Sequence, residues 1–136
     1  LVNHIKHGEL LKEYLDTLAD KQVFFIRGEV EVEKREKIKK IMETDTNVVC
    51  VAISAIFSTG INIKNLHNII FASGGKSFIR TVQSIGRGLR KHNLKSKLII
   101  FDVCDRLRYG IRHCEKRKDI YKKEKIKFTE TNIIEK

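Results

Sequence analysis

Two arginines three residues apart are the side chains of this sequence best suited to chemistry on a phosphate. They lie in the segment Gln83-Ser84-Ile85-Gly86-Arg87-Gly88-Leu89-Arg90. On a helix, residues three apart share a face, so Arg87 and Arg90 would point the same way, with Gln83 about one turn earlier. Two guanidinium groups on one face can bind a polyphosphate through paired hydrogen bonds. A solvated basic helix face would give the same pattern, so this segment alone leaves both interpretations open.

The composition favours a polyanionic partner. The chain has 136 residues, a length typical of one domain, and a formal net charge of +11. Such an excess of Lys and Arg suits nucleic acid first and an anionic membrane second. However, no apolar run approaches the roughly 20 residues of a spanning helix, and no signal peptide or lipidation motif is visible. The sequence therefore predicts a nucleic-acid partner and no membrane.

The cysteines and histidines predict neither a disulfide framework nor a metal site. The three cysteines, Cys50, Cys104 and Cys114, include no CxxC pair. An odd number of cysteines without a CxxC pair favours a reducing compartment, the cytoplasm of a bacterial or phage-infected cell. Cys50 lies in an apolar run and is expected to fill the core. His4 and His7 could form half of a metal site, but no second pair lies at a suitable spacing.

Short apolar runs alternate with amphipathic stretches along the chain. Strands are predicted at Leu1–Ile5, Val23–Ile26, Val48–Ile53, Asn68–Ala72 and Leu98–Val103, and helices at Glu9–Ala19, Glu33–Glu43, Phe78–Arg90 and Arg106–Lys127. Strands buried on both faces that alternate with helices predict an α/β fold, a parallel sheet with helices on both faces. Ligands of such sheets collect at the carboxyl ends of the strands, where Ser54–Ile63, Ser73–Lys76 and Asp102–Asp105 lie.

The chain is predicted to be a single domain over residues 1–136, with a basic helical extension over residues 104–127. Because its first strand begins abruptly, we expect it to be part of a longer protein. Between Asp105 and Lys127, ten Lys or Arg face four Asp or Glu, a net charge of +6. A solvated helix face and contact with a nucleic-acid backbone are both compatible with this run.

Several groups that nucleotide enzymes need are absent from the sequence. It contains no GxxxxGK[ST] phosphate loop, no acidic tetrad after a strand to hold magnesium, and no nucleophile paired with a base. The chain thus has cations that can stabilise phosphate charge, but no groups that bind a triphosphate with its metal. We expect it to be a poor nucleotide enzyme by itself.

Two segments resemble motifs of superfamily 2 helicases. Gln83-x-x-Gly86-Arg87-x-x-Arg90 is similar to motif VI. The segment from Ser54 to Ile63, with a hydroxyl residue six positions before Gly60, is similar to motif V, although Asn62 stands where the family usually has aspartate.

Two further segments fit the same lobe. Leu1–His4 resembles motif IV, and Phe25–Gly28 with Arg35 resembles the strand, glycine and downstream arginine of the motif that follows it. Order and spacing match the second, RecA-like lobe of these helicases. Within the family, the likeness is greatest to phage recombination and fork-remodelling helicases, and it continues weakly through His113, Arg117 and Tyr121.

The resemblance implies a role in ATP hydrolysis for five positions of the motifs. In the family, ATP with Mg²⁺ binds between two lobes, and motif VI arginines reach its phosphates. Arg90 matches the arginine finger and Arg87 its companion, which stabilise charge on the transferring phosphoryl group. Gln83 and Gly86 would position this pair, and Gly60 would allow a tight turn near the ligand.

Asn62 is a sixth position of the ATP site. It stands where the family's aspartate binds the ribose or couples to motif VI, and it can still accept a hydrogen bond but lacks the charge.

The resemblance and the charge together suggest contacts with nucleic acid. Ser54 matches the motif V hydroxyl that contacts the nucleic-acid backbone, and its alternative is a helix N-cap. Further contacts are suggested for Arg27, Gly28, Lys64, Arg80 and Lys91.

The resemblance implies the second motor lobe of an ATP-dependent DNA helicase that acts in recombination and repair. Its substrates would be single-stranded and branched DNA, forks or R-loops, including the RNA of the R-loops. Its partner would be an amino-terminal lobe that holds most of the ATP and Mg²⁺ site, and the isolated lobe would be inactive. The alternatives are a stand-alone nucleic-acid-binding module and the motor lobe of a restriction or remodelling translocase.

Overall fold

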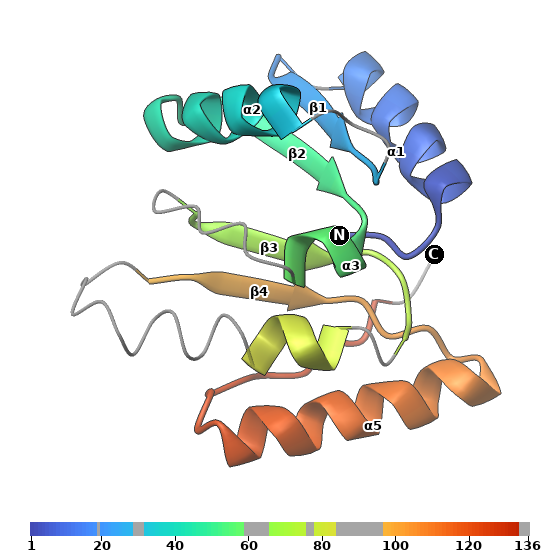
Figure 1. The fold of residues 1–136 in the computed structure, drawn as a ribbon. Coiled ribbons are helices and arrows are strands. Elements are labelled where there is room, and N and C mark those ends of the chain that lie inside the picture. Colours follow the sequence, from blue (N-terminus) through green and yellow to red (C-terminus); the bar gives the residue numbers. More distant parts are fainter. Residues whose placement is uncertain (19, 29–31, 59–65, 76–77, 84–96, 134–136) are drawn as a thin grey trace.

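The computed structural model describes residues 1–18, 20–28, 32–58, 66–75, 78–83 and 97–133. Within these ranges the elements are helices α1 (Ile5–Leu18), α2 (Val32–Thr44), α3 (Ser54–Ser58) and α5 (Arg108–Lys123), and strands β1 (Gln22–Ile26), β2 (Val48–Ala52), β3 (Asn68–Phe71) and β4 (Ile99–Asp102). Residues 78–83 are also helical. Figure 1 shows α1 and α2 beside the β1–β2 half of the molecule and α5 beside the β3–β4 half.

Leu1 and Val2 join two pairs of strands into one parallel arrangement. β1 pairs with β2 and β3 pairs with β4, both in parallel. On the β2 side, the amide of Val2 donates to the Ala52 carbonyl at 3.0 Å, and its carbonyl accepts from the Ser54 amide at 2.8 Å. On the β3 side, the Leu1 carbonyl accepts from the Ala72 amide at 3.0 Å. The spatial order is therefore β1, β2, Leu1–Val2, β3, β4, which confirms the predicted parallel α/β fold.

The first predicted strand is wrong beyond Val2, because the helix α1 begins at Ile5. The amphipathic spacing that predicted a helix from Glu9 already applies one turn earlier. Gly8 lets α1 approach the sheet closely, since a Cβ at this position would lie 2.5 Å from Cε2 of Phe25. Because α1 packs on the sheet at this contact, the first strand ends after a single parallel bridge between Val2 and Ile53.

The predicted basic helix is also shorter than expected. It spans Arg108–Lys123 instead of Arg106–Lys127. Lys125 has a φ of 57°, and the amide of Ile126 donates to the carbonyl of Tyr121 at 2.8 Å. A residue in the left-handed region just past the last turn, with a bond that returns to an earlier carbonyl, is a common way for a helix to end.

Helices cover both faces of the β1–β2 half. On one face, Val2, Val23 and Val51 pack with Leu11 and Leu15 of α1. On the other face, Ile26 and Ala52 pack with Ile38 of α2, and Met42 and Ile56 lie against this cluster. The two clusters follow from the alternation of side chains along each strand, which sends successive residues to opposite faces.

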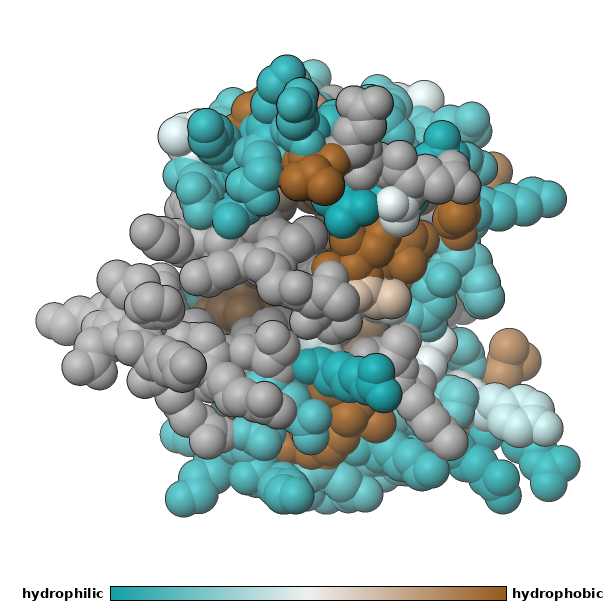
Figure 2. Space-filling model, in the orientation of Figure 1, coloured by the Kyte–Doolittle hydropathy of each residue, from teal (hydrophilic) through white to brown (hydrophobic). Residues whose placement is uncertain are grey.

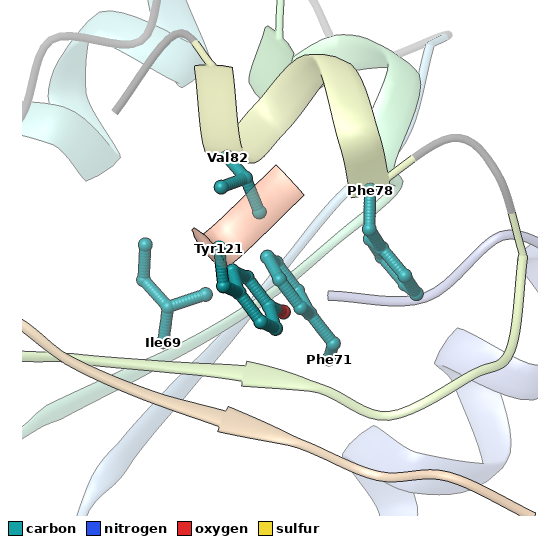
Figure 3. Packing of buried hydrophobic residues seen from close by; sticks show 5 residues of the cluster. All are labelled: Ile69, Phe71, Phe78, Val82 and Tyr121. Carbon is teal, nitrogen blue, oxygen red and sulfur yellow. The ribbon is translucent and has the colours of Figure 1, made fainter. Parts of the chain in front are cut away.

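The core of the β3–β4 half lies between the sheet and two helices (Figure 3). It consists of Ile69 and Phe71 of β3, Phe78 and Val82 of the helix at residues 78–83, and Tyr121 of α5. The rings of Phe71 and Phe78 stack with centroids 4.4 Å apart. This cluster holds the start of the predicted motif VI helix against β3.

The other face of β3 and β4 is open in the described part of the chain. Ile70, Ile99 and Phe101 are each 52% exposed, and the residues of β3 alternate between exposed and buried. The expectation that these two strands are buried on both faces is therefore wrong for the residues described.

Candidate nucleotide and nucleic-acid site

The carboxyl ends of the parallel strands bring three predicted segments together. The Asn3 side chain accepts from the Ser54 hydroxyl at 2.8 Å and donates to the Gly74 carbonyl at 3.0 Å. These residues follow the Leu1–Val2 segment, β2 and β3 in turn. One amide side chain thus connects the motif IV, motif V and post-β3 segments at the sheet edge where ligands of α/β folds bind.

Ser54 is placed at this edge but is 3% exposed. It is the first residue of α3, and its amide and hydroxyl are both engaged, with Val2 and Asn3. The hydroxyl connects two strand ends in this structure, and its contact with a nucleic-acid backbone stays a prediction.

The segment after β1 forms a local contact between two residues of the motif that it resembles. Arg35, on α2, donates to the carbonyl of Gly28 at 2.8 Å, so the glycine and the downstream arginine of this motif meet. Arg27 forms an exposed ion pair with Glu9 of α1 at 3.1 Å. Such surface pairs contribute about 0–1 kcal/mol, so the pair is not a strong constraint on Arg27.

The helix at residues 78–83 presents two of the predicted site residues. Phe78 and Val82 face the core, whereas Arg80 is exposed and Gln83 is partly exposed. The remaining predicted positions lie outside the described residues. They are Gly60, Asn62, Lys64, Gly86, Arg87, Arg90 and Lys91.

The helix α5 has one buried face and one basic, exposed face. Gly110, Cys114, Arg117 and Tyr121 are buried, at the spacing of one helical stripe. Hydrophilic residues dominate the lower edge of the molecule in Figure 2, where α5 lies in Figure 1. The exposed cations of this helix are Arg108, Arg112, Lys116, Lys122 and Lys123.

A buried ion pair connects α5 to the end of β4. The Arg117 guanidinium donates to both carboxylate oxygens of Asp102, each at 2.8 Å, and its side chain is fully buried. Tyr121 donates its hydroxyl to Asp102 Oδ2 at 2.7 Å. Burial and this hydrogen bond raise the pKa of Tyr121 above its usual value. Arg117 was expected only to add positive charge to a solvated or DNA-binding face, and that interpretation is wrong for this arginine.

Cys104 and Cys114 form a disulfide, with Cα atoms 5.9 Å apart. The prediction from cysteine spacing, which gave no disulfide framework, missed this pair. The turn between β4 and α5 brings the two cysteines together, and a spacing of ten residues gives no signal of this contact. Cys50 is a free thiol, as expected, and burial raises its pKa to about 12.

Sequence reasoning missed the roles of Asn3 and Asp102. Both lie at strand ends, which is the one signal that could have singled them out. Their partners are 51 and 15 residues away in the sequence, so only the fold shows them.

The described carboxylates at this edge do not form a magnesium site. Asp102 binds Arg117 and Tyr121, and Asp105 accepts from the Leu107 amide at 3.0 Å. Within the ranges that the structure describes, no group of three or more His, Cys, Asp or Glu could hold a metal ion. Among the same residues, no helix has the length and apolar character needed to cross a membrane.

The parallel sheet brings the described parts of the predicted motif segments, Asn3 and Ser54, together at the carboxyl ends of its strands. The model of the helicase conserved C-terminal domain matches residues 1–92, so the chain belongs to this family. Its fold is that of the C-terminal, RecA-like lobe of helicases.

Among characterised proteins, the chain is similar to the ATP-dependent DNA helicase UvsW of Enterobacteria phage T4. The two are 38% identical over 105 residues, which are 77% of this chain and 21% of that protein. The crystal structure of T4 UvsW matches with a TM-score of 0.69 and 33% identity, over 90% of this chain and 28% of that chain. The chain therefore spans about a fifth of the length of this relative.

Proposed function

We propose that this chain is the second motor lobe of an ATP-dependent superfamily 2 DNA helicase. The observation that carries the proposal is the arrangement of the motif segments in a chain of the helicase family. Leu1–Val2 and Ser54 lie at the carboxyl ends of the strands, and the helix at residues 78–83 packs on β3. A ligand that binds at the carboxyl ends of the strands would contact a site built from these segments.

The ATP site would be shared with an amino-terminal lobe. Among the described residues no group of three or more His, Cys, Asp or Glu could hold a metal ion, and the sequence contains no phosphate loop. The other lobe would bind the triphosphate with its Mg²⁺, and Arg87 and Arg90 would supply positive charge to the phosphoryl group as it transfers. Gln83, Gly86, Gly60 and Asn62 would shape the side of the cleft formed by this lobe. Closure of the cleft on ATP and its reopening after hydrolysis would move the lobes along one strand.

Nucleic acid would contact this lobe through its backbone phosphates. The net charge of +11 and the exposed cations of α5 support such contacts. Arg27, Gly28, Ser54, Lys64, Arg80 and Lys91 are the proposed contact residues. Contacts of this type carry no base information, so binding would depend on the structure of the nucleic acid and on salt.

The substrates would be single-stranded and branched DNA, forks and R-loops, the last of which contain RNA. The similarity to an ATP-dependent DNA helicase of a phage supports DNA as the substrate. The preference for branched DNA, forks and R-loops is what the motif resemblance implies. The protein would act in recombination and repair in the cytoplasm of a bacterial or phage-infected cell, and the lobe would be inactive when isolated.

The test is the ATPase and unwinding activity of the complete protein on a forked duplex, on a linear duplex of the same length, and on an R-loop. We expect turnover to require nucleic acid and unwinding to favour the fork and the R-loop. DNA binding without any turnover would overturn the proposal in favour of a binding module. Turnover with translocation but no strand separation would favour a restriction or remodelling translocase.

A further inference from the structure

The Arg117 side chain contacts four residues from three parts of the β3–β4 half. Besides the two bonds to Asp102, its Nη1 donates to the Gly75 carbonyl at 3.3 Å and its Nη2 to Cys104 Sγ at 3.6 Å. Its Cζ lies 6.0 Å from the centroid of the Phe78 ring. Gly75 lies in the segment after β3, and Phe78 is the first described residue of the helix that leads to motif VI.

Stability alone does not account well for a charge in this position. Burying an ion pair costs desolvation free energy, and the attraction between the two charges often does no more than offset this cost. Well-packed apolar residues can therefore replace such a pair without loss of stability. What a buried, bidentate guanidinium adds is geometry, because its planar group fixes the directions of its partners. Here those partners are the end of β4, the post-β3 segment and the ring of Phe78.

Tyr121 fixes the same carboxylate from the next turn of α5. It lies four residues after Arg117 and bonds Asp102 Oδ2, and its ring packs in the cluster with Phe71 and Phe78. Arg117 and Tyr121 lie on one helical stripe and both bond Asp102. The ring of Tyr121 also packs in the cluster that contains Phe78 and Val82 of the helix at residues 78–83 (Figure 3).

We propose that Arg117, with Asp102 and Tyr121, is a positioning residue for ATP hydrolysis: it fixes the helix at residues 78–83, which precedes Gly86, Arg87 and Arg90 in the sequence. The inference rests on the proposed function, since it assigns a second set of residues to the same ATP site. A displacement of about 1 Å in a catalytic group can cost about 100-fold in rate, so a buried anchor at the base of this helix matters for turnover.

The test compares Arg117→Lys and Tyr121→Phe with Tyr109→Phe in the complete protein. Tyr109 is exposed on the same helix, so Tyr109→Phe is a matched control for the loss of a polar group from α5. For each variant, kcat and KM for ATP are measured with saturating DNA, together with Tm. We expect Arg117→Lys to lower kcat by about 10- to 100-fold while KM for ATP stays within about twofold. Tyr121→Phe lowers kcat less, and Tyr109→Phe leaves it unchanged.

Measurements in the Arg90→Ala variant distinguish a positioning role of Arg117 from a general loss of stability. The same substitutions are made on Arg90→Ala, and phosphate release is followed in single turnovers with radiolabelled ATP. If Arg117 acts through motif VI, Arg117→Lys lowers the rate much less in this background than in the wild type. An equal fold-decrease in both backgrounds, or a folded Arg117→Lys variant with wild-type kcat, would overturn the inference. If Arg117→Lys does not fold, the same comparison with Tyr121→Phe decides.

The failure of this inference differs from a failure of the proposed function. Wild-type turnover that depends on Arg90, together with no effect of Arg117→Lys and Tyr121→Phe, rejects the positioning role alone. An inactive wild-type protein, or turnover indifferent to Arg90→Ala, rejects the proposed function and this inference with it.

Discussion

The hydroxyl of Ser54 donates to Oδ1 of Asn3 at 2.8 Å, across 51 residues of sequence. Asn3 donates in turn to the Gly74 carbonyl, so three strand ends are connected through one side chain. A site that spans several strand ends requires them to stay in register, and this pair of hydrogen bonds provides a direct connection between them.

Removal of Asn3 should destabilise the lobe more than removal of Ser54. Asn3→Ala leaves the buried Ser54 hydroxyl without this acceptor, which should lower the free energy of unfolding by about 1–3 kcal/mol, whereas Ser54→Ala should cost about 0.5–1.5 kcal/mol. Urea denaturation measures both. Thr17→Ala is the control, because its hydroxyl is exposed and bonds only within α1. If Asn3→Ala is no less stable than this control, the connection between strand ends has no energetic role.

Oxidation should stabilise the connection between β4 and α5. Cys104 and Cys114 close a loop with a sequence separation of ten residues. The chain-entropy model gives about 2–3 kcal/mol for a loop of this size, so Cys104→Ser with Cys114→Ser should lower the free energy of unfolding by this amount in protein purified without reductant. In that protein, alkylation after denaturation should modify Cys50 alone. Modification of all three cysteines would show that Cys104 and Cys114 are reduced. A difference in stability between the variant and the wild type could then not come from a disulfide.

The Cys50 thiol should make stability decrease with pH above about 9. Burial raises its pKa from 9.0 to about 12, so the folded state holds the proton more tightly than the unfolded state. This contribution is fully present below pH 9 and is lost as the pH rises toward 12. Between pH 9 and 10 the free energy of unfolding should fall by about 1 kcal/mol more in the wild type than in Cys50→Ala. Denaturation curves at the two pH values measure this difference, and identical losses in both proteins would contradict it.

The fold was largely predictable because its local signals agree with its tertiary packing. The apolar runs at β1, β2, β3 and β4 and the helical spacing in α1 and α2 gave each element to within a few residues. The exception, Leu1–Ile5, is a segment whose apolar residues suit either state. Its outcome depends on the contact of Gly8 with Phe25, 17 positions along the chain, which no local pattern shows.

The candidate site was predictable only where residue type and spacing carry the signal. Ser54, Gly28 and Gln83 could be placed at strand ends or on a helix from their motifs. The partners of Asn3, Asp102 and Arg117 could not, because each contact joins residues that come together only through tertiary packing. For the same reason Arg117 could not be distinguished from its exposed neighbours on α5 by its charge.

The most direct test of the motor-lobe proposal is the DNA-stimulated ATPase of the complete protein beside Arg90→Ala, with Lys97→Ala as a control for the loss of an exposed cation nearby in the sequence. An arginine finger is worth roughly 10³ to 10⁵ in rate in related phosphoryl-transfer enzymes, so kcat of Arg90→Ala should collapse by at least about 10³ while its affinity for forked DNA persists. Turnover that is indifferent to Arg90, or equal losses of DNA affinity and turnover, would contradict the account and make the arginine pair a phosphate-backbone contact.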